Sequence, residues 1–159
     1  MKRFLLFVFL FTLLVSSVSL ASPQTTYTVD DSFTIDIPAS HLITATKKSI
    51  ITQDNPFFLA ATFTSITRQN IDNELSHMLM VIEHSKIPHQ IESSGSLTLN
   101  NRDAAFILSS TNNCMMYEIL YIIYGDNIQC RVLAFGKYED LDKDRREIES
   151  IVSTIKMLK

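Results

Sequence analysis

The sequence contains no Trp, only three Gly and only two Cys in 159 residues. So few glycines leave no Gly-rich loop that could cradle phosphates, and no G-x-S-x-G turn presents a nucleophilic serine. Ser, His and Asp all occur, but their spacing does not indicate a catalytic triad. The absence of these local motifs favours a protein that is not an enzyme.

The chain begins like a secretory export signal. Lys2 and Arg3 precede an apolar run over residues 4–15, and mostly small residues follow as far as Ser22. A positive start, an apolar middle and a small-residue end predict cleavage between Ala21 and Ser22. The fully apolar part is shorter than the roughly 20 residues of a spanning helix, so cleavage is favoured over retention as a membrane anchor.

Removal of residues 1–21 predicts a mature protein, residues 22–159, that is periplasmic or secreted. These 138 of the 159 residues are enough for a single domain with one core. They carry 12 Lys and Arg against 17 Asp and Glu, a net charge of −5. The acidity is spread out and there is no Lys/Arg block, which argues against a nucleic-acid partner. No later segment is long and apolar enough to span a bilayer.

The first half of the mature chain has the pattern of strands. Phe33, Ile35 and Ile37 alternate with polar residues, which predicts a strand with one buried side. Pro38 is predicted to end this strand. Residues 49–52 and 57–67 are rich in β-branched and aromatic side chains and predict two more strands. Residues 22–26 are expected to form a short polar leader.

Two segments have helical spacing. The first, residues 70–86, is predicted to begin at the N-cap Asn70 and to end before Pro88. The apolar residues of its one face are Ile71, Leu75, Met78, Leu79 and Ile82. The second helix is predicted over Asp140–Leu158, with acidic residues early and Lys late, as the helix dipole favours.

Four strand-like segments lie between the two helices. They are Gln90–Leu99, Asp103–Thr111, Met115–Tyr124 and Ile128–Gly136. Turn-forming residues separate them, and connections this short make neighbouring strands antiparallel. The order strands, helix, four-strand meander, helix predicts an α+β domain, in which an antiparallel sheet carries the two helices packed on it.

This order resembles that of PsbP-like domains, a family that includes DcrB-like envelope proteins. The likeness rests on the opening strand at residues 33–38, the turn within residues 97–105 and the Tyr-rich hairpin within residues 117–135. It covers nearly all of the mature chain. The chain departs from the family in having Asn101 where Gly is frequent, and in lacking Trp. The resemblance implies an α+β fold and a binding or accessory protein rather than an enzyme.

The four histidines do not indicate a metal site. His77 and His84 share a helix face, but their spacing puts them about 10 Å apart, too far for one ion. Sulfur ligands such as Met78 and Cys114 would suit Cu(I), yet Met78 belongs to the apolar stripe, and Met commonly fills core gaps. No metal and no other cofactor is predicted.

The two cysteines, Cys114 and Cys130, allow two interpretations. An oxidising compartment favours a disulfide. If residues 125–127 form a hairpin turn, however, Cys130 faces about Ile122, and Cys114 lies roughly 26 Å further along the strand. The Cα atoms of a disulfide are only about 6 Å apart. A buried free Cys130 is therefore favoured, and the disulfide stays open as the alternative.

The strand over residues 115–124 carries apolar residues on both faces. Tyr117 and Tyr121 share one face with Ile119 and Ile123, and the other face has Glu118, Leu120, Ile122 and Tyr124. One face can therefore lie beneath a helix while the other forms a partly exposed groove. Core packing on both faces is favoured, and Tyr117 and Tyr121 are the candidates for a partner surface.

The function predicted from these features is that of an exported, non-enzymatic binding or accessory protein of the cell envelope, which engages a protein partner. A small exported hydrolase, whose site is assembled from residues distant in sequence, is one alternative. An envelope-tethered structural protein is the other, if the signal stays uncleaved. The sequence names neither the partner nor the oligomeric state.

Overall fold

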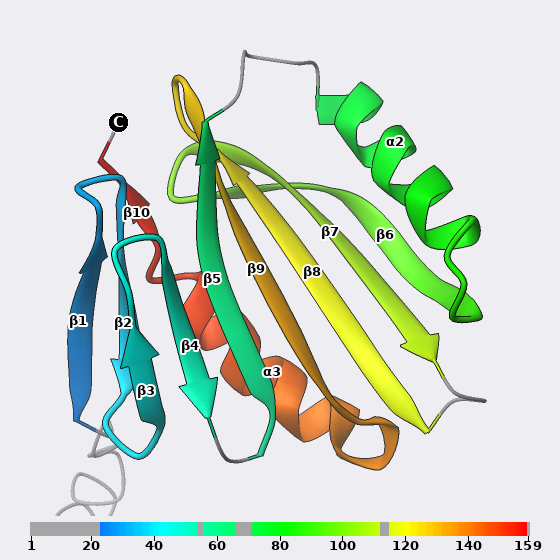
Figure 1. Cartoon of the computed structure of the whole chain (residues 1–159), viewed down its shortest axis with the longest axis horizontal. Coiled ribbons are helices and arrows are strands. Elements are labelled where there is room, and N and C mark those ends of the chain that lie inside the picture. The colour runs from blue at the N-terminus through cyan, green and yellow to red at the C-terminus, as the bar shows by residue number, and fades with distance from the viewer. Residues whose placement is uncertain (1–22, 54–55, 66–70, 112–114, 159) are drawn as a thin grey trace, which may run out of the picture.

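The strands form two antiparallel sheets, shown in the computed structural model of Figure 1, which describes residues 23–53, 56–65, 71–111 and 115–158. In these ranges the large sheet has the strand order β3-β4-β5-β9-β8-β7-β6, and the small sheet has the order β1-β2-β10. The elements are β1 (Gln24–Val29), β2 (Phe33–Pro38), β3 (Leu42–Ala45), β4 (Ser49–Gln53), β5 (Phe58–Ser65), α2 (Ile71–Glu83), β6 (His89–Leu99), β7 (Arg102–Thr111), β8 (Met116–Tyr124), β9 (Ile128–Lys137), the 3-10 helix η1 (Tyr138–Asp140), α3 (Leu141–Val152) and β10 (Lys156–Met157).

The sheet-rich α+β class, the antiparallel pairing and the meander β6-β7-β8-β9 are as the sequence predicts. The two-residue turn between β6 and β7 has φ values of 50° at Asn100 and 61° at Asn101. Such a turn needs positive φ at both central residues, and Asn tolerates that region better than other residues with a side chain. The Asn pair therefore fixes the register in which Leu99 faces Arg102.

Asn100 also joins the turn to the end of α3. Its Nδ2 donates hydrogen bonds to the carbonyl oxygens of Ser153, at 2.8 Å, and Ile155, at 2.7 Å. Ser153 is the C-cap of α3 and Ile155 follows the helix, so these bonds satisfy one carbonyl at the helix end and one just beyond it. One side chain thus stabilises both the hairpin and the helix end.

Replacing Asn100 by Ala is therefore expected to lower the free energy of unfolding by about 2–4 kcal/mol, because it removes two hydrogen bonds and places a less tolerant residue at positive φ. Asn100→Gly removes the same bonds without the backbone strain, so its loss is expected to be smaller. Urea denaturation of the two variants and the parent separates the loss due to the hydrogen bonds from the loss due to backbone strain. Equal stability of Asn100→Ala and the parent would contradict the role of this contact.

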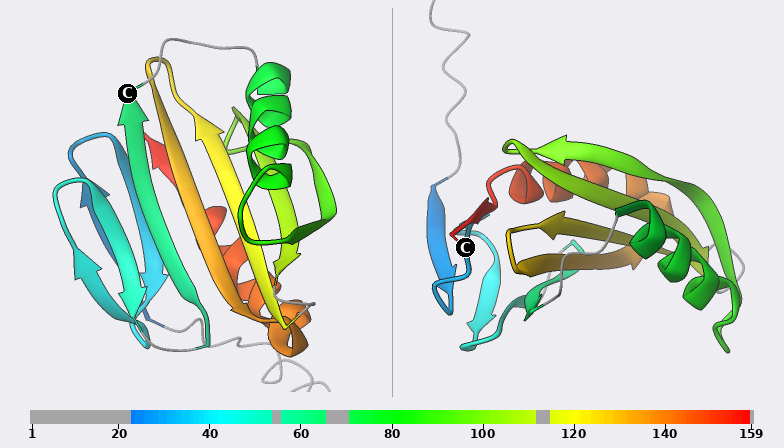
Figure 2. Two further views of the ribbon diagram at one scale, coloured as in Figure 1. Left: turned by 45° about the vertical axis from the view of Figure 1, so that its right-hand side comes forward. Right: turned by 90° about the horizontal axis from the view of Figure 1, so that it is seen from above.

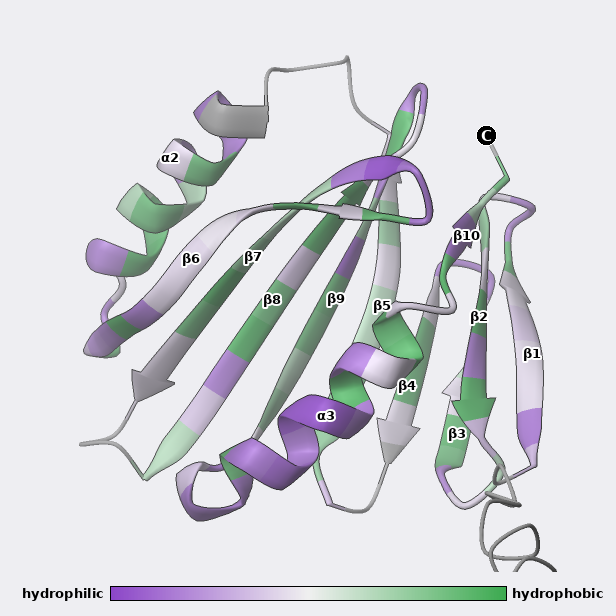
Figure 3. Cartoon of the chain, turned by 180° about the vertical axis from the view of Figure 1, so that it is seen from behind, coloured by the Kyte–Doolittle hydropathy of each residue, from purple (hydrophilic) through white to green (hydrophobic). Residues whose placement is uncertain are grey.

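The two helices lie on opposite faces of the large sheet (Figure 2). Helix α3 contacts β9 and β2, whereas α2 contacts β6 and β7. The main core lies on the α3 side, where Phe33, Ile35 and Ile37 of β2 are fully buried together with Ile148 and Ile151 of α3. The outer side of α3 is hydrophilic (Figure 3). None of the helices in the described ranges is long and apolar enough to cross a membrane.

The second helix is shorter than predicted, because α3 ends at Val152 rather than at Leu158. Thr154 Oγ1 donates to the Ile151 carbonyl at 2.7 Å and accepts from the Asp36 backbone N–H at 2.8 Å, which ties the chain to β2 at this point. Ile155 is buried outside the helix, and the chain then pairs with β2 as β10. The apolar spacing correctly predicted that Ile155 is buried, but it did not predict that the backbone there is no longer helical.

Besides β10, two further strands were not expected. Residues predicted to be a polar leader form the first half of β1, and β3 has no counterpart among the predicted elements. Both strands are mostly exposed, so neither shows the apolar alternation that reveals a half-buried strand. Their hydrogen bonding to β2 and β4 holds them in place.

Candidate functional site

The candidate site lies on the face of the large sheet that α2 covers only in part. Cross-strand registers on this face align an apolar row over five strands, which consists of Ile51, Ala60, Leu133, Leu120 and Ile107. Ile107, at the β7 end of the row where α2 contacts the sheet, is only 2% exposed. The other four side chains are half-buried. In Figure 1 no described helix lies in front of β5 and β9.

Between α2 and this row lies a groove of about 360 Å³. Its lining consists of Met78, Val81 and Ile82 of α2 and Ala60, Thr62, Glu118, Leu120, Arg131 and Leu133 of the sheet. A space of this size, apolar with a few polar groups, is within the range of ligand sites in proteins. It is an open groove rather than a closed cavity, because Val81 remains 54% exposed.

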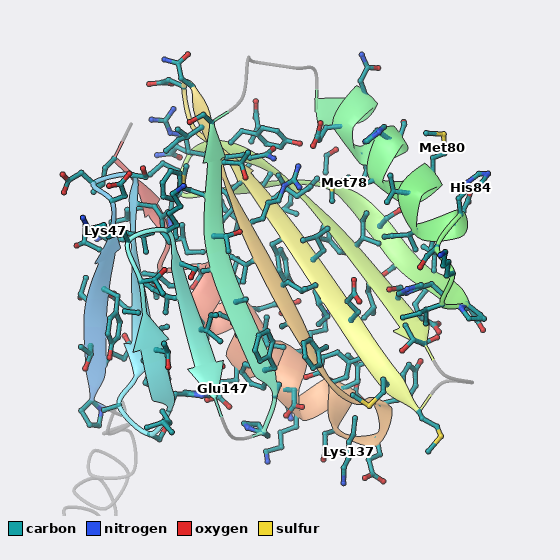
Figure 4. All side chains as sticks on the ribbon, in the orientation of Figure 1. Lys47, Met78, Met80, His84, Lys137 and Glu147 are labelled. Atoms are coloured by element: carbon teal, nitrogen blue, oxygen red, sulfur yellow. The ribbon has the colours of Figure 1, made fainter. Side chains whose placement is uncertain are left out.

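Helix α2 forms the wall of the groove, and its side chains are only partly buried. Figure 4 places Met78 on the sheet side of α2 and Met80 on the outer side. No described side chain of α2 is fully buried, and Met80 is 50% exposed. The predicted apolar stripe is therefore present, but the sheet covers it incompletely. Apolar surface on both sides of a groove is a usual mark of a contact site.

The apolar surface continues past the groove onto β5 and β9. The rings of Phe58 and Phe135 face each other across the strand pair, with centroids 4.6 Å apart. Phe135 is 39% exposed. Stacked rings of this kind provide a large and rigid contact area.

An ion pair closes one end of the groove. Arg131 Nη2 donates to Glu74 Oε1 of α2 at 3.1 Å. With its amide oxygen turned toward Arg131, Gln129 accepts two further bonds at 2.6 and 2.7 Å. These contacts fix the start of α2 over the sheet and leave the groove open toward Phe135.

A second group of polar side chains fastens α3 from beneath. Tyr117 Oη donates to Asp144 Oδ2 at 2.9 Å, and His41 Nε2 lies 2.9 Å from Glu147 Oε1. Burial raises the pKa of Asp144 above its usual range, and burial together with the Asp144 bond raises that of Tyr117. Tyr117 and Asp144 have no exposed surface, so they cannot touch a substrate in this structure. Their arrangement supports a structural role.

A second hollow, of about 370 Å³, lies beside α3. Leu97, Leu99 and Phe106 give it an apolar lining, and Arg145 Nε donates to Glu149 Oε1 at its edge at 2.8 Å. Burial, with Glu149 nearby, raises the pKa of Tyr121 to about 12. Arg145 and Glu149, the charged groups among the described residues of this hollow, pair with each other, so neither is left free to bind a charged ligand.

The structure places the predicted partner surface in the core. Tyr117 is 0% exposed and Tyr121 only 4%, because their face of β8 is the one that α3 covers. The opposite face, with Glu118 and Leu120, forms the floor of the groove. The sequence therefore revealed the two-faced strand and favoured the core packing found for Tyr117 and Tyr121, but these two residues are corrected as candidates for a partner surface.

Other predicted positions are only partly covered by the structure. Cys130 is a free, buried thiol whose pKa is raised by burial, whereas Cys114 lies outside the described residues. The cleavage site at Ala21 and Ser22 also lies outside them. Among the described residues, no three or more His, Cys, Asp or Glu side chains are grouped to hold a metal ion.

Neither the family models nor the curated proteins include a match to this sequence. Solved structures do match. The cyanobacterial PsbP (CyanoP) of Synechocystis sp. PCC 6803 has a TM-score of 0.68 at 8% identity, covering 89% of this chain and 95% of that chain. A Pseudomonas aeruginosa protein of unknown function has a TM-score of 0.54 at 9% identity, covering 82% and 94%. A Bacteroides thetaiotaomicron protein has a TM-score of 0.57 at 10% identity, covering 86% of this chain and 48% of its own.

Proposed function

Since this chain has a PsbP-like fold, we propose that it is a non-enzymatic accessory protein that binds a protein partner in the groove between α2 and the large sheet. In this proposal the meander forms the floor of the site and α2 forms its wall. In this proposal, the export signal predicted at residues 1–21 directs the protein to the cell envelope or out of the cell.

One observation carries the proposal. Val81 of the groove wall is 54% exposed, and half-buried Leu120 and Leu133 lie on the floor. Phe135, which is 39% exposed, continues this apolar surface beyond the groove. A partner that covered this surface would remove it from water, at a gain of about 25 cal/mol for each Å² of apolar area. Interfaces of protein partners have such apolar centres.

The polar pairs under α3 are the other place where chemistry could occur. Asp144 combines a raised pKa with a bound phenol, which are features of some catalytic acids. It has no exposed surface, however, and its second oxygen, Oδ1, has no hydrogen-bond partner among the described residues. The groove is accessible and the pair is not, which favours binding over catalysis as the proposed function.

The test is a substitution that makes the groove polar without adding charge. Val81→Asn should leave the fold intact because the side chain is largely exposed, and should reduce capture of a partner about tenfold, since it removes an apolar contact. Leu42→Asn is the matched control, because Leu42 is 59% exposed on β3, outside the groove. Immobilised parent and variants are exposed to an envelope extract, and the bound proteins are quantified by mass spectrometry.

A protein held equally by the parent and Leu42→Asn, and about tenfold less by Val81→Asn, is the expected result. Equal amounts on all three baits, or no protein held by the parent, would contradict the proposal.

A further inference from the structure

Glu118 is a half-buried acid on the floor of the groove. It lies on β8, directly opposite Phe135 of β9 and Ser109 of β7. Its side chain lines the groove beside Leu120, two residues further along the same face. Among the described residues its carboxylate has neither a hydrogen-bond partner nor an ion-pair partner.

The cations near Glu118 are already engaged. Of the described residues that line the groove, only Glu118 and Arg131 are charged, and Arg131 lies 3.1 Å from Glu74. Lys137 follows Phe135 on the same face of β9, and its Nζ lies 3.6 Å from Glu139 Oε1. The groove therefore presents one negative charge that no described residue compensates.

An unpaired carboxylate among apolar groups loses hydration without gaining a partner, which is costly. An approaching cation would offset this cost, and the pair would strengthen as the groove is closed to water. We propose that the groove binds a protein segment in which apolar side chains flank one Lys or Arg, whose cation pairs with Glu118. This inference rests on the proposed function of the groove and names the chemistry of its partner.

The groove and the apolar surface that continues from it to Phe135 are long enough for a short segment. At a strand rise of about 3.4 Å per residue, the chain from Arg131 to Phe135 spans about 14 Å. At a helix rise of about 1.5 Å per residue, α2 from Glu74 to Ile82 spans about 12 Å. The paired Arg131 and Glu74 lie at one end and the unpaired Glu118 toward the other. The basic residue of the segment therefore lies at the Phe135 end, and its apolar residues lie on Leu120 and Leu133.

The experiment selects peptides instead of assuming one. A phage library of random 12-residue peptides is panned on the purified protein, and the selected peptides are measured by fluorescence anisotropy. We expect enrichment of Lys or Arg between apolar residues. Glu118→Gln should weaken their binding about fivefold to tenfold, as loss of a partly desolvated pair does. Asp142→Asn, which removes an exposed charge on α3, is the matched control and should change nothing.

A double-mutant cycle between the protein and a selected peptide tests whether Glu118 contacts the basic residue of the peptide. Changing the basic residue of a selected peptide to Gln should cost the same factor on the parent and nothing further on Glu118→Gln. Peptides without basic enrichment, or with equal affinity for Glu118→Gln and the parent, would overturn the pairing while leaving groove binding intact if Val81→Asn still weakens them. Selected peptides that Val81→Asn binds as well as the parent does, or a failure to select any, would overturn the proposed function as well.

Discussion

Tyr117→Phe is expected to lower the free energy of unfolding by about 1.5–3 kcal/mol at pH 7, whereas Asp144→Asn is expected to raise it. The Tyr117 hydroxyl donates the only hydrogen bond that Asp144 Oδ2 receives from the described residues, and the other oxygen, Oδ1, has none. Without the hydroxyl, a fully buried carboxyl group would lack any partner. Asn at position 144 keeps an acceptor for Tyr117 and carries no charge to bury.

The effect of Asp144 depends on pH in a defined direction. Burial raises its pKa in the folded state above the value of about 3.9 in the unfolded chain. The folded state therefore holds its proton more tightly, and this contribution to stability is complete below about pH 3.9 and is lost as the pH rises through the folded pKa. The advantage of Asp144→Asn over the parent should grow from about pH 4 toward neutrality.

Urea denaturation at several pH values between 4 and 7 measures both effects. The double variant Tyr117→Phe with Asp144→Asn serves as the control, since it removes the bond and the charge together and should lose less than Tyr117→Phe alone. An Asp144→Asn variant that is less stable than the parent at pH 7, or a difference that does not change with pH, would contradict this description of the pair.

Gly136→Ala is expected to lower the free energy of unfolding by about 2–3 kcal/mol. Gly136 faces Tyr117 across the β8–β9 pair, and a Cβ atom there would lie 2.7 Å from the Tyr117 hydroxyl oxygen and 2.9 Å from two ring carbons. The ring is fully buried, and its hydroxyl is held by Asp144, so it cannot move aside at little cost. Only glycine fits this close approach.

Gly95→Ala is the matched control, also on a strand of the large sheet. Its Cβ would lie 3.3 Å from a ring carbon of Phe106, which is only half-buried and can shift. Its loss of stability in urea should be clearly smaller than that of Gly136→Ala. In a Tyr117→Phe background, Gly136→Ala should also cost less, because the closest contact is gone. Equal losses for the two glycine substitutions would show that the ring at position 117 does not restrict this site.

The sequence predicted the parts of the fold that local chemistry determines. Residues 70–86 predicted a helix that the structure has at Ile71–Glu83, and the Asn100-Asn101 turn marked its hairpin correctly. The end of α3 could not be read in the same way, because Ile155 continues the apolar spacing after the helix has ended. Apolar periodicity reports which residues are buried, and a turn beside the core buries a residue as well as a helix does.

The candidate site shows a related limit. Strand alternation predicted that Tyr117 and Tyr121 share one face of β8 and that Glu118 and Leu120 share the other. It could not predict that α3, which follows 17 residues after β8 ends at Tyr124, covers the tyrosine face. Which face a helix covers depends on contacts between distant elements, such as those of α3 with β2. The sequence therefore indicated that one face of β8 can form a groove, but it did not predict which face.

The buried polar pairs had no signal in the sequence. His41 follows β2 and Glu147 lies on α3, and their 2.9 Å contact joins residues 106 positions apart. A lone His or Glu in such segments resembles any surface residue until the fold is known. The same holds for Glu118, because its lack of a partner among the described residues depends on how the sheet is assembled.

The central claim, that the groove between α2 and the large sheet holds a protein partner, is tested most directly by photo-crosslinking in living cells. A benzophenone amino acid is placed at Val81, in the groove, or at Leu42, outside it, since both positions are largely exposed. Position 81 should form an adduct with a distinct protein, attached within a short apolar segment that contains Lys or Arg, and position 42 should not. Equal adducts from both positions, or an adduct from position 42 alone, would contradict the claim.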